Sequence, residues 1–176
     1  AKNIDTYMPK TTGFVQYQPT FTFHGYRYVE LTGYDSAHKP SVDWLKGKVL
    51  HSDFDVYNNF SSSHAKLNKL SDNVAWGLRG NFLDIPTDCP QRDERLGWLG
   101  DAQCCSKSAL YNANLASFNA KWLADVRDAQ YDFGAYSTFA PRPYPKLVWY
   151  SPGWMEAGIM VPYNTYKFDG ETKIIE

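Results

Sequence analysis

The chain has 176 residues, of which 43% are hydrophobic, and this composition supports a folded core and excludes global disorder. The formal net charge of -1 gives no electrostatic reason to expect nucleic acid or an acidic membrane surface as a partner. No apolar run approaches the roughly 18 residues of a membrane-spanning helix, so a membrane partner is not expected either.

The first third of the chain has the pattern of β-strands. Residues 20–31 are rich in β-branched and aromatic side chains, and residues 46–52 form a candidate second strand. Two or three strands cannot make a stable sandwich alone. We therefore expect residues 1–60 to be the C-terminal strands of a larger β-sandwich domain.

Helical patterns begin after residue 60. A first helix is predicted to follow the polar segment 61–64. Its apolar face consists of Leu67, Leu70, Val74 and Leu78. A second helix is predicted to begin with Asp101 as its N-cap. It carries a stripe of small side chains that would let another helix approach closely: Ala102, Cys105, Ala109 and Ala113.

Two further helices are predicted in the last third. The third covers residues 119–130, with Leu123 and Val126 facing inward, and the fourth begins near Trp154 after a loop rich in Pro, Tyr and Ser. We expect three other tryptophans to belong to the core: Trp76, Trp122 and Trp149.

The cysteines give no sign of a disulfide framework or a zinc site. Cys89, Cys104 and Cys105 are odd in number, two are adjacent, and spacing such as CxxC is absent. Buried free thiols are the expectation.

Opposed charges are concentrated in DCPQRDERLGWLGD, residues 88–101. One interpretation is a solvated loop in which the arginines pair with Asp93 and Glu94. However, Trp98 lies four residues after Glu94, and the flanks are apolar enough to hold the loop against a core. The mixture also fits glycoside cleavage, which needs one protonated carboxyl, further carboxylates to bind sugar hydroxyls, and an aromatic face for the ring. Clustered like charges would raise the pKa of one carboxyl.

The stretch DCPQRDERLGWLGDAQ resembles the signature of the α-L-rhamnosidases of glycoside hydrolase family 78, usually DCPQRDERLGWTGDAQ, with Leu99 as the departure. FTFHGYRYVE at residues 21–30 resembles the last β-sandwich strands before that family's catalytic domain. GWMEA at residues 153–157 resembles its GWGDA motif, with Glu156 where Asp is usual.

The resemblance implies β-sandwich strands followed by the first helices, over residues 61–176, of an (α/α)6-barrel catalytic domain in a multidomain glycoside hydrolase. It implies inverting hydrolysis of terminal α-L-rhamnose, with Glu94 as general acid and no metal or organic cofactor. The rhamnose-containing carbohydrate would be bound by Asp88, Arg92, Trp98, Asp101 and Trp154.

The resemblance places the catalytic base, a Glu, beyond this chain. The chain begins without Met and ends at Ile175-Glu176 without a capping Gly, so we expect a fragment of a longer protein, with a complete small α+β domain as the alternative. Two other functions remain open. A non-catalytic carbohydrate-binding protein could use the same acids and tryptophans, and a structural protein could use the segment only as an ion-pair loop.

Overall fold

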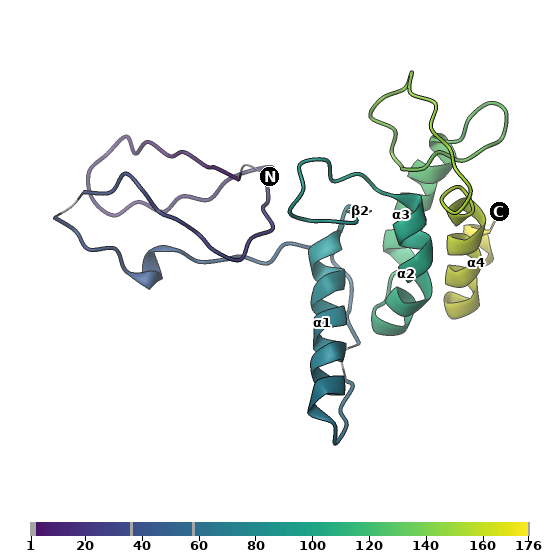
Figure 1. The fold of residues 1–176 in the computed structure, drawn as a ribbon, viewed down its shortest axis with the longest axis horizontal. Coiled ribbons are helices and arrows are strands. Elements are labelled where there is room, and N and C mark those ends of the chain that lie inside the picture. Colours follow the sequence, from purple (N-terminus) through teal and green to yellow (C-terminus); the bar gives the residue numbers. More distant parts are fainter. Residues whose placement is uncertain (1–2, 36, 58, 176) are drawn as a thin grey trace.

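The computed structural model describes residues 3–35, 37–57 and 59–175. An extended N-terminal segment, residues 3–35 and 37–57, projects to one side of a helical body (Figure 1). The helices are α1 (Ala65–Asn81), α2 (Leu99–Asn112), α3 (Ala116–Asp128) and α4 (Ala157–Asp169), with 3-10 turns η1 (Val42–Trp44) and η2 (Thr172–Ile174). The strands β1 (Phe82–Leu83) and β2 (Ile85–Pro86) form a short antiparallel hairpin. Within the described ranges, no helix is both long and apolar enough to cross a membrane.

The strands predicted at 20–31 and 46–52 are not formed. Among the described residues of the N-terminal segment, regular structure is limited to η1 and one isolated bridge, between Val56 and Ala113. A strand is stable only when a neighbouring strand pairs with its backbone groups. The N-terminal segment doubles back on itself (Figure 1), but its described residues form no strand ladder, so the β-sandwich part of the predicted fold class is not observed.

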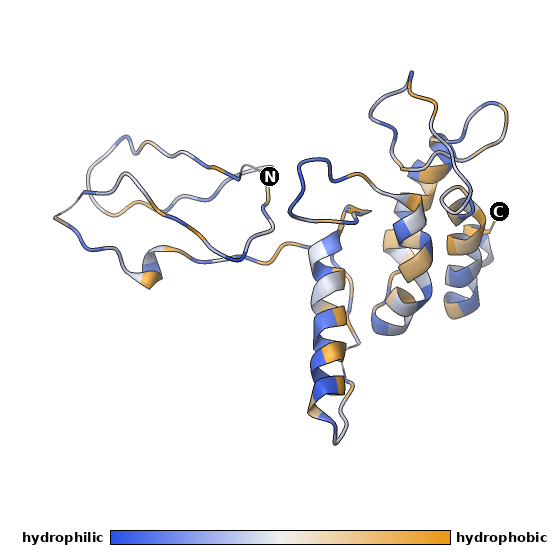
Figure 2. Ribbon diagram, viewed as in Figure 1, coloured by the Kyte–Doolittle hydropathy of each residue, from blue (hydrophilic) through white to orange (hydrophobic). Residues whose placement is uncertain are grey.

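The first predicted helix is confirmed as α1, which begins at Ala65 directly after the polar segment. The Ser62 hydroxyl accepts the His64 N–H at 3.2 Å, next to the helix start. The predicted apolar face is buried only at Leu78, and the remaining members, Leu67, Leu70 and Val74, are exposed. Figure 2 shows this mixture of apolar and polar residues along α1.

The prediction that Asp101 caps the second helix is wrong, because α2 begins two residues earlier, at Leu99. The Leu99 N–H donates to the Thr138 carbonyl at 2.9 Å, so the start of the helix is fixed by a neighbouring loop. Asp101 lies in the first turn, where a carboxylate still interacts favourably with the helix dipole. The small-residue stripe is largely buried, as predicted: Ala102, Ala109 and Ala113.

The other two helices are confirmed with shifted bounds. α3 starts at Ala116, with Val126 buried and Leu123 partly buried against the core. α4 starts at Ala157, because residues 152–156 form turns before the helix. α4 packs beside α2 and α3, and buried hydrogen bonds reinforce this contact. The Asn119 side chain donates to Thr165 at 2.8 Å.

Two apolar clusters form the core. One joins α2, α3 and α4: Leu99, Ala102, Trp122, Val126, Ala129, Ala140, Ala157 and Val161. The other lies where α1, β1, α2 and α3 meet: Leu78, Phe82, Ala109, Leu110, Ala113, Leu115 and Phe118. Trp122 is therefore a core residue, as predicted. Trp76 and Trp149 are not, because each is about half exposed.

All three cysteines are free, as predicted. Burial raises the pKa of the Cys105 thiol to about 11, so this group stays protonated near neutral pH. The expectation that the thiols are buried is wrong for Cys104, which is exposed on α2, and is met only in part by Cys89 and Cys105, which are partly buried.

Candidate active site

The charged loop, residues 88–98, is anchored at its start by the β1–β2 hairpin. Asp84 at the hairpin tip has a positive φ of 65° and donates its N–H to the Ser52 hydroxyl at 2.8 Å. The Lys121 ammonium on α3 lies 3.1 Å from the Asp84 carboxylate and 2.9 Å from Asp125. The Thr87 N–H, next to Asp88, donates to the Asn81 carbonyl at 2.9 Å.

The end of the charged loop pairs with the loop between α3 and α4. The Ala140 N–H donates to the Gly97 carbonyl at 3.0 Å, and Trp98 forms an isolated antiparallel bridge with Phe139. The indole N–H of Trp122 donates to the Ala140 carbonyl at 3.1 Å, which ties this pairing to the core. Both ends of the loop are thus fixed, and the predicted structured loop is observed.

Glu94 lies in the charged loop beside Trp98 and Asp88. The Trp98 indole N–H donates to Glu94 Oε2 at 2.8 Å. Although Glu94 is open to solvent, the atoms around its carboxyl remove part of its hydration, and this raises its pKa. The Trp98 hydrogen bond lowers the pKa, Asp88 raises it, and the positive charge of Arg92 lowers it, with a net upward shift. The protonated form of Glu94 is therefore favoured relative to that of a free glutamate.

Asp88 presents an unsatisfied acceptor in the same place. Its Oδ1 atom is buried and makes no hydrogen bond within the described part of the chain. A buried acceptor without a partner costs about 1–3 kcal/mol, so a ligand hydroxyl could gain affinity here. The pKa of the Cys89 thiol is raised by a hydrogen bond with Asp88 and by partial burial, which leaves this thiol protonated and unreactive.

Trp98 is held by other aromatic rings. Its ring packs edge-on against Phe139, with 5.4 Å between centroids, and against Trp149, at 5.7 Å. The backbone N–H of Trp149 donates to the Tyr131 hydroxyl at 2.8 Å. Trp98 thus has a fixed orientation, with its N–H directed at Glu94 and part of its ring exposed.

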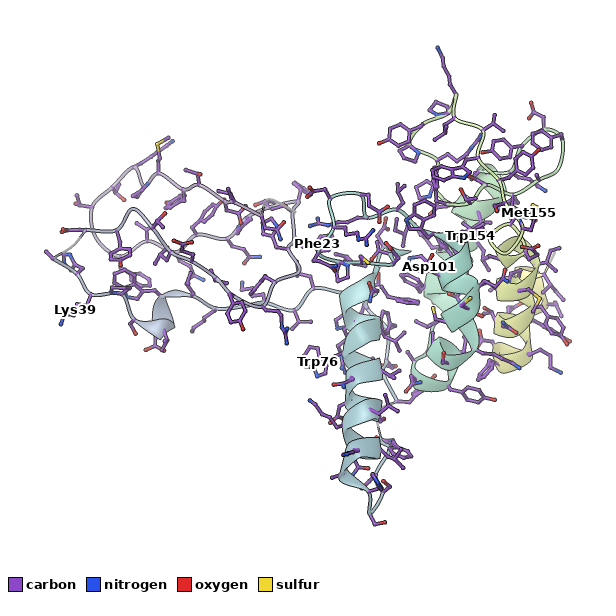
Figure 3. All side chains as sticks on the ribbon, in the orientation of Figure 1. Phe23, Lys39, Trp76, Asp101, Trp154 and Met155 are labelled. Atoms are coloured by element: carbon purple, nitrogen blue, oxygen red, sulfur yellow. The ribbon has the colours of Figure 1, made fainter. Side chains whose placement is uncertain are left out.

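Asp101 and Trp154 lie together at the start of α2 (Figure 3). The Trp154 indole packs on Gly100, where an added Cβ would come within 2.7 Å of the indole Nε1. Trp154 is 39% exposed, and Asp101 is also exposed. Glu156 accepts the Gly153 N–H at 2.6 Å, so its carboxylate stabilises the turn that carries Trp154.

The structure therefore brings together Asp88, Arg92, Glu94 and Trp98 within one loop. It places Asp101 on the adjoining first turn of α2, and the ring of Trp154, from the turn before α4, against Gly100 of that same turn. Sequence reasoning missed the contact of Trp149 with Trp98, because the two residues are far apart in the chain and only folding joins them. In the described ranges there is no group of three or more His, Cys, Asp or Glu side chains that could hold a metal ion.

Two family models match the chain. The bacterial alpha-L-rhamnosidase six-hairpin glycosidase domain matches residues 55–176. The bacterial alpha-L-rhamnosidase concanavalin-like domain matches residues 1–51.

Several relatives carry the name alpha-L-rhamnosidase. Those of Formosa agariphila and an Alteromonas species are 45% and 44% identical to this chain over 100% of its length. The chain covers 19% of each, so it spans about a fifth of the length of these curated relatives.

Solved structures agree with these relatives. The Streptomyces avermitilis α-L-rhamnosidase complexed with L-rhamnose is 44% identical, with a TM-score of 0.85 over 90% of this chain and 15% of that one. The α-L-rhamnosidase of Aspergillus terreus is 34% identical, with a TM-score of 0.83 over 90% of this chain and 18% of that one. The family model over residues 55–176 and the identity over the whole chain show that this chain belongs to the bacterial α-L-rhamnosidases of glycoside hydrolase family 78.

Proposed function

We propose that the protein containing this chain is an inverting α-L-rhamnosidase, which removes terminal α-L-rhamnose from glycosides or polysaccharides. The observation that carries the proposal is Glu94, a carboxyl with a raised pKa that accepts the Trp98 indole N–H inside the family signature. The names of the relatives support the substrate class.

The proposal includes two domains. Residues 1–60 would be the end of a β-sandwich domain, and residues 61–176 the first helices of an (α/α)6-barrel catalytic domain. The matches to a concanavalin-like domain and a six-hairpin domain support this division. Near the end of the first of these ranges, backbone hydrogen bonds from Ser52 to Phe82 and from Tyr57 to Asn112 attach the chain to the helical body.

In the proposed reaction, protonated Glu94 donates its proton to the glycosidic oxygen as the bond from that oxygen to the anomeric carbon breaks. The aglycone leaves as an alcohol. A water molecule attacks the anomeric carbon from the opposite face, and a second carboxylate accepts its proton, so the product is β-L-rhamnose. This base would be a Glu outside the present chain, in a protein of the relatives' length.

The sugar would be fixed by the surrounding side chains. The unsatisfied Oδ1 of Asp88 would accept one rhamnose hydroxyl, and Arg92 would donate to another. Asp101 would bind a hydroxyl from the first turn of α2. The rings of Trp98 and Trp154 would cover the apolar faces of the sugar. This mechanism uses no metal or organic cofactor.

The test is Glu94→Gln in the whole protein, measured on an alkyl α-L-rhamnoside and on p-nitrophenyl α-L-rhamnoside. An alkoxide leaves poorly without a proton, so kcat/KM for the alkyl substrate should fall by about 10²-fold or more. The loss should be smaller for nitrophenol, a better leaving group. Asp93→Asn removes a neighbouring exposed carboxylate and is the matched control, with turnover expected near that of the parent protein.

Unchanged turnover of the alkyl rhamnoside by Glu94→Gln would overturn the assignment of the acid. The alternative function, a non-catalytic carbohydrate-binding protein, predicts a different result. The parent protein would then bind the rhamnoside at saturation and release no free rhamnose after long incubation.

A further inference from the structure

The charged loop is also supported from outside the helical body. Phe23, in the N-terminal segment, places its ring under the Arg95 guanidinium, with 4.2 Å between Cζ and the ring centroid. This is cation–π geometry, in which the negative face of the ring attracts the cation. Figure 3 shows Phe23 beside the charged loop, far in sequence from it.

Arg95 links the Phe23 ring to the turn that contains Glu94. Its Nε–H donates to the Arg92 carbonyl at 3.1 Å, which closes a turn around Asp93 and Glu94. The backbone of Arg95 has a φ of 44°, a left-handed conformation that side chains other than Gly rarely adopt. Such a conformation persists only where surrounding contacts hold it. The contact with Phe23 and the bond to Arg92 are the described contacts that hold it.

A second contact lies on the other side of the same turn. Gly25 packs against the backbone of the charged loop so closely that an added Cβ would be 2.9 Å from the Gln91 nitrogen. Between these contacts, His24 Nε2 lies 2.9 Å from the Asp5 carboxylate, which braces the segment itself. Residues 23–25 therefore touch the loop before and after the residues Arg92 and Glu94.

We propose that Phe23, Gly25 and Arg95 are positioning residues that hold the proton donor Glu94 in its reactive geometry. The inference rests on the proposed role of Glu94. It extends that role by making the efficiency of proton donation depend on a segment that matches a different family domain. Small displacements of a catalytic group lower the rate strongly, so loosening this support should weaken protonation of the leaving group.

The test replaces Phe23 by Leu in the whole protein, which keeps apolar bulk but removes the ring. The matched control is Phe21→Leu, the same change at a fully exposed ring two residues earlier. For Phe23→Leu we expect kcat/KM for an alkyl α-L-rhamnoside to fall about three- to tenfold. The value for p-nitrophenyl α-L-rhamnoside should change less, and KM for both substrates should stay nearly constant.

Two further variants separate positioning from loss of fold. Phe23→Tyr retains the aromatic face and should restore the ratio between the two substrates. Arg95→Lys loses the Nε–H donor that links the ring contact to the Arg92 carbonyl, and it should add little to Phe23→Leu, because both changes break the same series of contacts from Phe23 to the turn. A merely structural role predicts an equal loss on both substrates, no rescue by Tyr, and additive effects, and any of these would overturn the proposal.

The same variants distinguish this inference from the proposed function. If Glu94→Gln changes the substrate ratio and Phe23→Leu does not, the positioning role is wrong and the acid stands. If Glu94→Gln itself leaves the ratio unchanged, the acid assignment fails and so does the positioning role. Hydrogen exchange at residues 91–95 then still tests whether Phe23 restrains the charged loop. Faster exchange in Phe23→Leu than in Phe21→Leu would support this restraint, and equal exchange would exclude it.

Discussion

At the scale of single residues, the hydrogen bond from Trp98 to Glu94 acts on the protonation of the candidate acid. The indole N–H stabilises the carboxylate form and so lowers the pKa of Glu94, against the upward effects of lost hydration and of Asp88. Catalysis requires the protonated form, so activity should be lost as pH rises through this pKa. The position of the alkaline limb of the pH–rate profile therefore reports on Trp98.

We predict that Trp98→Phe moves the alkaline limb of kcat/KM to higher pH. The substitution removes a donor that lowers the pKa of Glu94, so the carboxyl should stay protonated further into the alkaline range. KM should also rise, because the smaller ring covers less of the sugar. Trp76→Phe on α1 is the control, since this exposed indole contacts no residue of the charged loop among the interactions described. A limb that stays in place or moves to lower pH would contradict the prediction.

The sequence was sufficient to choose the candidate residues but not to place all of them. Asp88, Arg92, Glu94 and Trp98 lie close in the chain, so one loop brings them together whatever the rest of the fold does. Asp101 was predicted to be a cap, but Leu99 begins the helix by bonding to Thr138, a contact that no local pattern contains.

At the scale of secondary structure, the first turn of α2 supports the Trp154 ring, which packs on Gly100. We predict that Gly100→Ala raises KM for rhamnosides about three- to thirtyfold, because the added methyl would come within 2.7 Å of the indole nitrogen and displace the ring. Gly77→Ala in α1 is the matched control. An added Cβ meets nothing within 4 Å there, so the change should stabilise the helix by about 0.5–1 kcal/mol and leave KM unchanged.

Steady-state kinetics and urea unfolding of both variants test this prediction. If Gly100→Ala lowers the free energy of unfolding and leaves KM unchanged, Trp154 does not contact the substrate.

Helices were predicted better than strands for a physical reason. The backbone hydrogen bonds of a helix lie within the helix, so the patterns after residue 60 were enough to locate α1 to α4 within a few residues. A strand needs a partner, and the β-branched and aromatic composition of residues 20–31 contains no information on what pairs with it. The exposed face of α1 is a similar case, because burial depends on which element packs against it.

At the scale of the whole molecule, the N-terminal segment is attached to the helical body in two places. One is the contact of residues 23–25 with the charged loop. The other lies at Ser52 to Tyr57, where the Phe54 ring packs edge-on against Phe82 and Phe118, whose own rings are in contact. The first contact consists of one cation–π pair and the packing of Gly25 on the loop backbone, so the second, with its backbone hydrogen bonds and aromatic packing, should supply most of the attachment energy.

We predict that Phe54→Ala lowers the free energy of unfolding by about 2 kcal/mol, since removing a half-buried aromatic ring loses its edge-on packing against two others. The ring centroid of Phe54 lies 6.3 Å from that of Phe82 and 6.2 Å from that of Phe118, both in edge-on packing. Phe60→Ala removes an exposed ring from the same part of the chain and should change stability by less than about 0.5 kcal/mol.

Urea unfolding of the two variants measures the difference in their free energies of unfolding. Hydrogen exchange at residues 91–95 shows whether the loss of the Phe54 ring also loosens the charged loop. If Ser52 to Tyr57 fixes the N-terminal segment in place, Phe54→Ala should also speed exchange in the charged loop, because Phe23 and Gly25 would be held less firmly against it. Lower stability with unchanged exchange would mean that the two attachments act independently. The support that residues 23–25 give to the charged loop would then not depend on Phe54.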